Sequence, residues 1–521
     1  MTALSRLTPV LVLAAVALVG APSAGAGVRA TLLQLEPRAA CTEAVALARS
    51  GGREIDAELR LWRVPAGTAR RIVPSLRAHR ALAFAQPERT YRVTVDEAPE
   101  PLQGDEWWRS QIGIDGVTPP GPGVPVTIVD TGLDFSHPEF AGRPDLLALN
   151  AQEPAGVGGE HGTMVASVIG APVNGVGIVG IYPRAVIRSW DIAKGTGREL
   201  DSTEISGGIL AAARAGRTVI NLSVGGTRDL AVELAISEAV AKGSLVVAAA
   251  GNDGDRGNAL SYPAALPHVT TVAATERSGG VAAFSSRSPF VDLAAPGEDI
   301  VVASALGKDW RRSSGTSFSA PLVAGAAAWI WTVRPELTAG QVAEVLRRSA
   351  RDIGPAGRDP AAGFGVLDVA AALALPAPVR DPFEPNDDIE EVDPNGDRFM
   401  GQAPPLTTPT RRSSRVVGTV DAYEDPRDVY RVWLPARSRF AATLRSPANA
   451  DLALYSTSAP TVSGRFASTG RLASAATKAQ PERLSFGNSG KGRWAYVVVK
   501  LPSATLDATY RLDVVATPAR V

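Results

Sequence analysis

Cysteine is nearly absent from this sequence. The 521 residues include a single cysteine, Cys41, and only four histidines. One thiol cannot form an internal disulfide, and no Cys/His spacing of the zinc type occurs. Cys41 is either a reactive thiol or, as is commoner, a small buried apolar residue. A chain without disulfides must be held by a large hydrophobic core, by ions, or by both.

The sequence also has no excess of either charge. Its 53 Lys and Arg residues balance 53 Asp and Glu residues, and no basic cluster stands out along the chain. We therefore expect neither nucleic acid nor an anionic membrane as a partner. Hydrophobic residues make up 45% and charged residues 20%, which indicates folded domains, and the length suggests two or three of them.

No segment after the N-terminal one is a convincing transmembrane helix. Arg6 precedes an apolar stretch over 7–20, and Ala-Gly-Ala at 24–26 fits the small-residue rule for signal-peptide cleavage. The alternative is a membrane anchor, but the run is short for a spanning helix. We expect a signal peptide over 1–26, a secreted, extracellular protein, and no stable membrane insertion after cleavage.

Periodicity divides the next part of the chain into two regions. Residues 27–100 mix short alternating runs such as 55–61, typical of half-buried strands, with a helical stretch. Over 101–376, short apolar runs alternate with helical stretches, which predicts an α/β domain with a parallel sheet covered by helices on both faces. The strands expected there are 124–129, 185–190, 218–222, 245–250 and 269–273, and the expected helices are 230–242 and 320–333.

The last part of the chain carries strand-like segments only. An acidic, proline-containing stretch within 377–414 is typical of a linker. From 415 to 521, strand-like segments separated mostly by turn residues predict a β-sandwich. These segments are 415–420, 428–434, 440–444, 450–455, 494–500 and 510–515.

Three short motifs in the α/β region carry residues that suit nucleophilic catalysis. Asp130 ends an apolar strand before Thr-Gly, and active sites of parallel sheets lie beyond the carboxyl ends of strands. His161 begins a His-Gly-Thr motif that leads into an apolar, helix-like run. Ser317 lies in Gly-Thr-Ser-Phe-Ser-Ala-Pro, where a helix N-terminus would suit a developing oxyanion. Singly, each has a plainer explanation: a strand-end turn residue, a surface histidine and a helix cap.

Together the three residues form the set that a serine nucleophile needs. A serine hydroxyl is a poor nucleophile at neutral pH without a base. A histidine base needs an acid that fixes its tautomer and stabilises its charged form. The chain order Asp130, His161, Ser317 is that of subtilisin and differs from those of chymotrypsin and the α/β-hydrolases. We predict a serine endopeptidase with these three catalytic residues and no cofactor required for the chemistry.

These motifs resemble those of the subtilisin-like serine proteases, the subtilases, over about 105–375. Ala-Ala-Gly-Asn at 249–252 fits the same family, and the resemblance implies that Asn252 is the side-chain donor of the oxyanion hole, together with the Ser317 backbone N–H. The related sedolisins have Glu in place of the histidine and Asp at the oxyanion position. His161 and Asn252 therefore favour activity at neutral to alkaline pH, since a histidine base must be unprotonated.

The resemblance also implies a substrate cleft. The segment 221–226 is similar to the edge segment that, in the family, pairs with the substrate backbone as an added strand. A strand end followed by a glycine turn is the plainer explanation. The wall and base of the first side-chain pocket are expected from 249–251 and from the serine before Tyr-Pro. The substrate-binding residues implied in this way are Ser223, Val224, Gly225, Ala249, Ala250, Gly251 and Ser261.

Residues 27–100 resemble, more coarsely, the propeptides of secreted subtilases. Such a propeptide assists folding, blocks the cleft with its C-terminal strand and is removed by the enzyme itself. The resemblance implies a cleft-directed strand over 90–96, cleavage near 95–101 and loss of Cys41. A small domain that stays attached is the alternative. The expected partners are protein or peptide substrates and the chain's own propeptide as an intramolecular inhibitor.

The acidic stretch and the strands after it resemble bacterial pre-peptidase C-terminal domains, which are β-sandwiches appended to secreted proteases. Asp-Pro-Phe-Glu-Pro-Asn-Asp at 381–387 carries that resemblance. Some such domains bind calcium through this segment, and Glu384, Asn386 and Asp387 offer oxygen ligands that suit a hard cation. A structural Ca²⁺ and a solvated acidic linker are the two alternatives.

Two other functions compete with a self-processing protease. One is a catalytically silent binding protein on a protease scaffold, which would have no chemical need for the triad and Asn252 together. In the other, the C-terminal part 381–521 carries the biology by binding a polymer or a surface, and the protease is its payload.

Overall fold

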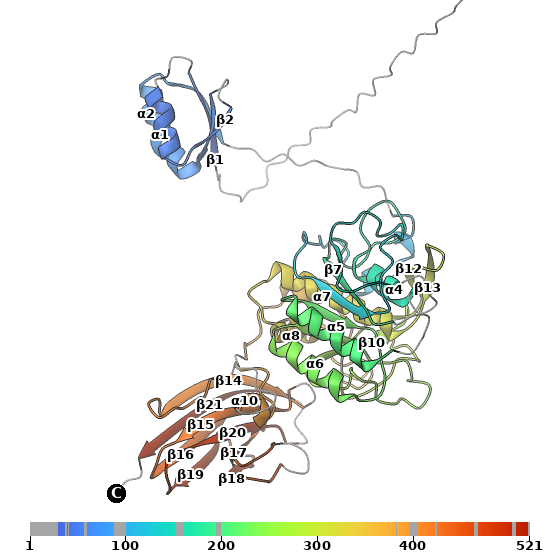
Figure 1. The fold of residues 1–521 in the computed structure, drawn as a ribbon, viewed down its shortest axis with the longest axis vertical. Helices are drawn as coiled ribbons and strands as arrows, with labels where there is room; N and C mark the ends of the chain where they lie inside the picture. The colour runs from blue at the N-terminus through green and yellow to red at the C-terminus, as the bar shows by residue number, and fades with distance from the viewer. Residues whose placement is uncertain are drawn as a thin grey trace, which may run out of the picture. The chain divides into compact units, whose positions relative to one another are not determined.

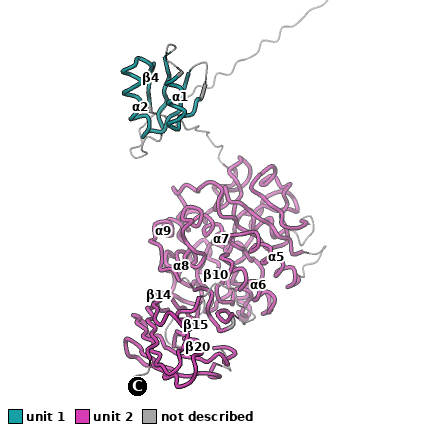
Figure 2. Tube along the Cα trace, turned by 60° about the vertical axis from the view of Figure 1, so that its left-hand side comes forward, with its two compact units in different colours: residues 1–96 teal, residues 97–521 magenta. Residues whose placement is uncertain are grey.

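The computed structural model describes most of the chain, as two compact units. The described residues are 30–36, 39, 41–56, 60–87, 100–152, 160–193, 200–381, 383–394, 404–422, 425–462, 467–502 and 507–518. The units are residues 1–96 and 97–521 (Figure 2). The expected signal peptide, the strand over 90–96 and most of the expected cleavage region lie outside the described residues.

The N-terminal unit is a small antiparallel sheet with two helices. Its strand order is β2-β3-β1-β4, and its core includes Leu33, Leu47, Trp62 and Val64, all buried. Two buried residues, Ala69 and Leu76, come from α2. The elements are β1 (Ala30–Leu35), α1 (Cys41–Arg49), β2 (Arg53–Asp56), β3 (Leu61–Pro65), α2 (Ala66–Ala78) and β4 (Leu82–Pro87).

The second unit (Figure 1) is built on a parallel sheet of seven strands. Their order is β11-β10-β9-β8-β5-β7-β6. Every pair of neighbouring strands is parallel, which confirms the predicted α/β class. The strands are β5 (Val126–Asp130), β6 (Leu146–Ala148), β7 (Ile187–Asp191), β8 (Val219–Leu222), β9 (Leu245–Ala249), β10 (Val269–Thr275) and β11 (Val291–Pro296).

Helices cover both faces of this sheet. One core cluster joins one face to α4, α7 and α8, and another joins the opposite face to α5 and α6. The central strands are buried on both faces, which explains why they are continuous apolar runs rather than alternating ones. The helices, with the hairpin beside α4, are η1 (Gln103–Asp105), α3 (Trp108–Gln111), α4 (Glu160–Gly170), α5 (Ser202–Arg214), α6 (Leu230–Ala241), β12 (Ile300–Ser304), β13 (Asp309–Ser313), α7 (Thr316–Val333), α8 (Ala339–Ser349) and α9 (Val369–Ala374).

The central helix α7 is apolar on all sides. It begins at Thr316, directly after Gly315 and four residues before the start that the apolar pattern predicts. Among the described residues it is the one helix long and apolar enough to span a membrane, but 83% of it is buried inside the unit. Such burial is that of a core helix.

The C-terminal part is a sandwich of two four-stranded antiparallel sheets, as predicted. Their strand orders are β14-β21-β16-β19 and β15-β20-β17-β18, and one core cluster fills the space between them. The short helix α10 (Ile389–Val392) packs by both end residues on the other side of the second sheet. The strands are β14 (Ser413–Asp421), β15 (Arg427–Leu434), β16 (Ser438–Arg445), β17 (Asp451–Ser456), β18 (Arg471–Ala475), β19 (Glu482–Asn488), β20 (Arg493–Lys500) and β21 (Asp507–Pro518).

Candidate active site

Asp130 ends β5, a central strand of the parallel sheet. Its side chain is 1% exposed, so it is held by hydrogen bonds rather than by water. The backbone N–H of Thr131 donates to Asp130 Oδ1 at 2.7 Å. A buried carboxylate with this orientation lies at the carboxyl end of the sheet, where parallel α/β folds place their active sites.

His161 lies in the first turn of α4, and its ring meets Asp130. His161 Nδ1 is 2.8 Å from Asp130 Oδ1 and 3.0 Å from Oδ2. The turn is anchored by the backbone N–H of Gly162, which donates to Thr131 Oγ1 at 3.1 Å. A Cβ at position 162 would lie 2.1 Å from the carbonyl oxygen of Gly132. Only glycine therefore lets the helix come close enough to β5 for the His–Asp contact.

The surroundings of His161 raise its pKa above the ordinary 6.5. Burial by itself lowers the pKa, but the charge of Asp130 and its hydrogen bond to the ring outweigh that effect, and the charge of Glu160 adds to the increase. Glu160 is buried beside the histidine, where Ser304 Oγ donates to it at 2.6 Å. A base with a raised pKa stays protonated to higher pH, so any activity that needs neutral His161 is lost as pH falls through that raised value.

Glu160→Gln is expected to shift the acid limb of the pH–kcat/KM profile to lower pH. The substitution keeps an acceptor for Ser304 and removes one negative charge that favours protonated His161. Glu233→Gln removes the same charge from α6, on the opposite face of the sheet from α4, where Glu233 pairs with Arg228, and it serves as the control. An acid limb that stays at the same pH, or shifts to higher pH, would show that the charge of Glu160 does not raise the pKa of His161.

Ser317 is the second residue of α7, so its backbone N–H is among the free donors of the helix N-terminus. Its hydroxyl donates to the Ser223 carbonyl oxygen over a long 3.4 Å. Ser223 Oγ in turn donates to the Ser317 carbonyl at 3.0 Å. The next residue, Phe318, packs near His161, with ring centroids 6.0 Å apart. These contacts bring the start of α7 to the same end of the sheet as the His–Asp pair.

Asn252 is oriented by the residue before the serine. Asn252 Oδ1 accepts hydrogen bonds from the Thr316 backbone N–H at 2.9 Å and from Thr316 Oγ1 at 3.0 Å. Because a backbone N–H can only donate, the amide must present its oxygen to Thr316, which leaves the NH₂ group to face elsewhere. Gly315 has a φ of +156°, and a Cβ there would be 3.4 Å from Asn252 Nδ2.

The expected substrate-binding residues converge beside this site. A Cβ on Gly225 would lie 2.4 Å from Ser261 Oγ, and one on Gly251 would lie 3.1 Å from Ser261 Cβ. Gly226 and Tyr262 pair their backbones at 2.9 and 3.0 Å. A cavity of about 210 Å³ adjoins them. Its lining combines apolar side chains with polar ones and with the edge segment: Leu200, Ile205, Val232 and Leu266, then Ser202, Thr227 and Asp229, then Val224 and Gly225.

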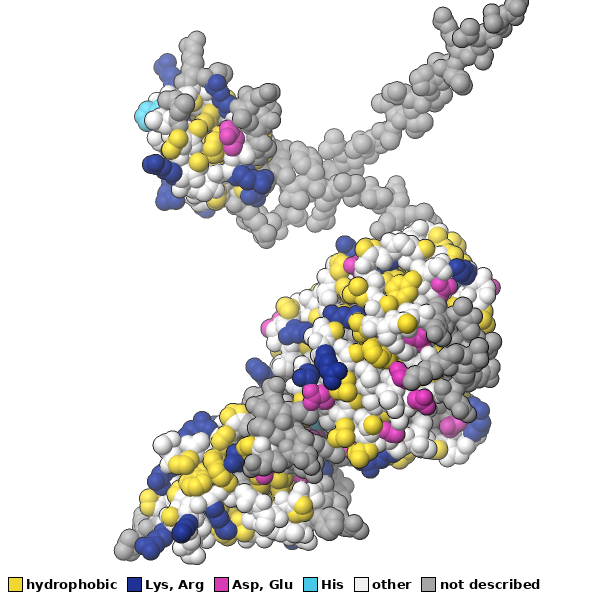
Figure 3. All heavy atoms as spheres, viewed as in Figure 1, with side chains coloured by type: hydrophobic (Ala, Val, Ile, Leu, Met, Phe, Trp, Pro, Cys, Tyr) yellow, Lys and Arg dark blue, Asp and Glu magenta, His cyan; other side chains and the backbone are white. Residues whose placement is uncertain are grey.

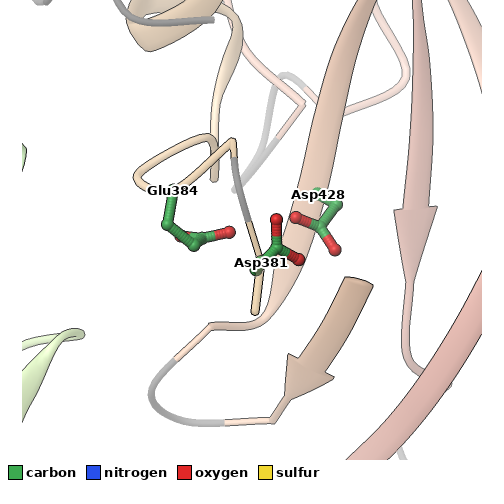
Figure 4. A group of neighbouring side chains, drawn as sticks. All are labelled: Asp381, Glu384 and Asp428. Carbon is green, nitrogen blue, oxygen red and sulfur yellow. The ribbon is translucent and has the colours of Figure 1, made fainter. Parts of the chain in front are cut away.

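The expected metal ligands fall into a larger acidic group. Glu384 meets Asp381 and Asp428, with one carboxylate oxygen of each within 4.8 Å of the others (Figure 4). Burial, and then the charges of Asp425, Asp428 and other acids, raise the pKa of Glu384 well above its usual range. Asn386 is completely buried, and neither amide atom has a hydrogen-bond partner among the described residues.

Asp387 is not one of that triplet, but it shares a neighbour with Glu384, because His268 Nε2 is 3.8 Å from Glu384 Oε2. Asp387 Oδ2 is 2.6 Å from Nε2 of His268, a residue of the α/β part, while its Oδ1 is buried without a hydrogen-bond partner among the described residues. Asp381 and Asp428 were not among the ligands expected from the sequence. The spacing of 381–387 shows only the local acids, whereas Asp428 comes from β15, more than forty residues later.

At one end of the parallel sheet, a strand end thus carries a carboxylate, and the starts of two helices carry an imidazole and a hydroxyl. This fold and these groups are those of a serine hydrolase. A sequence model of the subtilase family matches residues 121–365. Subtilisin from Bacillus pumilus is 35% identical over 257 residues, which are 48% of this chain and 91% of that protein. The chain belongs to the subtilase family, a family of serine endopeptidases.

Other relatives match over a smaller share of their own length. Subtilisin E from Bacillus subtilis (strain 168) is 35% identical over 257 residues, 48% of this chain and 66% of that protein, just under two thirds. Minor extracellular protease Epr from the same strain is 32% identical over 273 residues, 52% of this chain and 41% of that protein. A solved protease from Pseudoalteromonas arctica PAMC 21717 is 26% identical, with a TM-score of 0.46, over 54% of this chain and 99% of that chain.

Proposed function

We propose that the chain is a secreted serine endopeptidase that cleaves peptide bonds through an acyl-enzyme on Ser317. The observation that carries the proposal is the 2.8 Å contact between His161 Nδ1 and Asp130 Oδ1. With Nδ1–H held by the carboxylate, Nε2 carries the free lone pair and can accept the Ser317 proton. The bond between Ser317 and His161 is expected to form when a substrate binds, as catalytic hydrogen bonds often tighten only then.

The proposed reaction has two halves. Ser317 Oγ attacks the scissile carbonyl while His161 takes its proton, and Asp130 stabilises the imidazolium. The oxyanion of the tetrahedral intermediate accepts hydrogen bonds from Asn252 Nδ2 and the Ser317 backbone N–H. His161 then protonates the leaving amine, and a water activated by the same histidine hydrolyses the acyl-enzyme.

Substrate binding is assigned to the edge segment and the pocket beside it. Ser223, Val224 and Gly225 would pair with the backbone of an extended peptide as an added strand. Residues 249–251 and Ser261 would form the pocket for the side chain before the scissile bond. The close approach of Ser261 to Gly225 and Gly251 supports this assignment, since larger residues at the two glycine positions would fill the space.

Labelling with a fluorophosphonate that reacts with activated serines tests the proposal. We expect a stoichiometric mass increase on the tryptic peptide that contains Ser317, and its loss in His161→Ala, where the hydroxyl remains but the base is gone. Labelling of a different serine would refute the assignment of the nucleophile. Equal labelling in His161→Ala would refute the role of the base.

We further propose that residues 1–26 direct secretion and that 27–100 is a propeptide removed by the enzyme itself. Similarity to an extracellular protease, Epr, supports secretion. The separate compact unit over 1–96 supports a removable segment. N-terminal sequencing of the mature protein from culture medium is expected to begin near 95–101.

We also propose that the acidic group around Glu384 binds a structural Ca²⁺. Carboxylate and amide oxygens are the ligands that Ca²⁺ prefers. Fully buried Asp428 and Asn386, each with an oxygen that has no hydrogen-bond partner among the described residues, fit a cation better than a solvated linker. Asp381, Glu384 and Asp428 would be ligands, and Asn386 and Asp387 would complete the shell.

Calcium is expected to stabilise the full-length protein and so to raise its Tm. At a hundredfold excess of calcium over Kd, the free energy of unfolding should increase by about 2.7 kcal/mol. Asp428→Asn should abolish this gain, because it removes a charged ligand without changing side-chain volume. Asp451→Asn, a buried acid of the same sandwich outside the group, should retain it. Calorimetry with EDTA and with calcium measures the difference. An undiminished gain in Asp428→Asn would argue against this site.

A further inference from the structure

One outer face of the sandwich is covered with arginine. The sheet β14-β21-β16-β19 turns alternate residues toward the core and toward solvent, and direct register pairs show which ones share a face. Thr443 of β16 is paired with Asp513 on one side and Arg483 on the other, and Asp513 is paired in turn with Arg415. The arginines of this outer face are Arg415, Arg439, Arg445, Arg483 and Arg511.

These arginines are exposed and only partly neutralised. The side chains of Arg415, Arg445 and Arg511 are 63%, 45% and 43% exposed. A single carboxylate, Asp513, faces all three, at 2.5, 2.6 and 3.5 Å. Arg439 donates instead to Ser485 Oγ at 2.7 Å. Asp421 and Asp507 form a further register pair on the same face, at the end of β14 and the start of β21. The described part of the face therefore carries five guanidinium groups against three acids.

The like charges are also close together. Arg445 and Arg511 are direct cross-strand neighbours, a pairing that destabilises an antiparallel sheet unless a counter-charge lies nearby. Burial alone would raise the pKa of Asp513, but its bonds to Arg415 and to the neighbouring arginines outweigh that effect and lower it. One carboxylate is thus already held between several guanidinium groups, which shows that this group fits the face.

Charge is distributed unevenly along the chain. The whole chain is neutral, but residues 415–521 contain 15 Lys or Arg and eight Asp or Glu, a formal net charge of +7. Figure 3 shows Lys and Arg side chains spread over the visible face of the sandwich, with few acidic ones. A basic surface of this kind attracts polyanions.

We propose that this arginine face binds a linear polysaccharide built from uronic acids. Guanidinium groups pair with carboxylates through two parallel hydrogen bonds. Strands about 4.8 Å apart, and residues about 6.8 Å apart along each strand, repeat these groups over a flat surface rather than in a pocket. The hydroxyls of Thr443, Ser485 and Thr517 on the same face can bond to sugar hydroxyls.

Nucleic acid fits this face less well. Proteins that hold single strands use aromatic side chains on which bases stack, and the outward residues of these four strands include no aromatic side chain. Of the aromatic residues of these strands, Phe440 and Tyr510 are buried in the core, and Phe486 is partly buried against it. A polymer recognised by its repeated carboxylates needs no stacking, so bound polyuronate would hold the protease on an acidic matrix.

Binding to polygalacturonate tests this proposal, with the full chain in its Ser317→Ala form to prevent self-cleavage. The face variant is Arg439→Ser, Arg445→Ser, Arg483→Ser. The control variant, with the same change of charge on the other sheet and its flanking loop, is Arg471→Ser, Lys478→Ser, Arg493→Ser. Retained Tm values establish that both are folded. At low salt the face variant is expected to bind at least tenfold more weakly than the parent, with a shallower dependence of log Kd on log salt.

The control variant is expected to bind within about threefold of the parent, since the polymer contacts counted by the salt slope lie on the arginine face. Equal weakening in the two variants would show attraction by net charge alone and overturn the assignment. So would parent binding no stronger than binding to neutral dextran. Tighter binding to single-stranded DNA or dextran sulfate of matched charge would overturn the choice of a carboxylate polymer.

Discussion

A precursor carrying Ser317→Ala is expected to stay full-length and to leave casein uncleaved, while the wild-type precursor loses roughly the 27–100 segment and cleaves casein. Removing the hydroxyl removes the nucleophile, and the expected fall in kcat is about 10⁶-fold, the size known from the serine of subtilisin. The fold should survive, because Ser317 is only half-buried and its hydroxyl bond to Ser223 is long, at 3.4 Å. Mass spectrometry and a casein assay measure both effects.

Ser314→Ala provides the matched control for this experiment. Ser314 is exposed, three residues before Ser317, and its hydroxyl accepts a hydrogen bond from the Asp299 backbone at 2.9 Å. It should be processed and should cleave casein as the wild type does. Processing or cleavage by Ser317→Ala would mean that another residue is the nucleophile. A wild-type precursor that stays full-length and inert at neutral pH with calcium would favour the silent binding scaffold.

The parallel sheet could be predicted from the sequence because burial on both faces removes polar residues from its strands. Strands β5, β8, β9 and β10 lie within two residues of the predicted runs. Strand β13 was missed because its five residues, Asp-Trp-Arg-Arg-Ser, are largely exposed and show neither alternation nor an apolar run. Its place is set by antiparallel pairing with β12, which local pattern does not encode.

The alternating run over 55–61 predicts one strand, whereas the structure divides it between two. Strand β2 ends at Asp56 and β3 begins at Leu61, and the two pair antiparallel. Arg60 between them has a φ of +52°, a left-handed conformation that an extended strand does not contain. An alternating sequence therefore occurs both in one continuous strand and across the ends of two antiparallel strands. The period of the pattern alone does not distinguish these two arrangements.

The residues that support the proposed catalytic groups depend on distant contacts and were missed. Gly162 must be glycine because of the carbonyl of Gly132, thirty positions earlier. Thr316 turns the amide of Asn252 through bonds that span 64 residues. Short motifs give the types of the reacting groups, but they do not tell which neighbours hold each group in place.

The same limit applies to charge. No basic cluster stands out along the sequence, and neither nucleic acid nor an anionic membrane was expected as a partner. On strands, however, only every second residue faces outward, and Arg415 and Arg511 lie on paired strands although they are 96 positions apart. The acidic group is likewise assembled from separate segments, with Asp381 and Asp428 brought to one point by the fold. Arginines thus gather on one outer face and acids in a largely buried group, in a chain whose formal net charge is zero.

Asn252→Asp and Asn252→Leu are expected to reduce kcat by about 10²–10³-fold, with little change in KM. This loss, about 3 kcal/mol of transition-state stabilisation, is the size known for the oxyanion-hole asparagine of subtilisin. The reason is that the amide NH₂ would donate only to the oxyanion that forms in the transition state, so ground-state binding does not depend on it. Steady-state kinetics on a chromogenic peptide separates kcat from KM.

The aspartate variant distinguishes catalysis from support. It keeps an oxygen that can accept from the Thr316 N–H and hydroxyl, the two bonds that Asn252 makes in the structure at 2.9 and 3.0 Å. It loses the donor, and its negative charge repels the oxyanion. If Asn252 only positioned the start of α7, aspartate would be nearly as active as asparagine, and leucine would be the damaging substitution. If Asn252 is the oxyanion donor, the aspartate variant is at least as impaired as the leucine variant, although it keeps the bonds to Thr316.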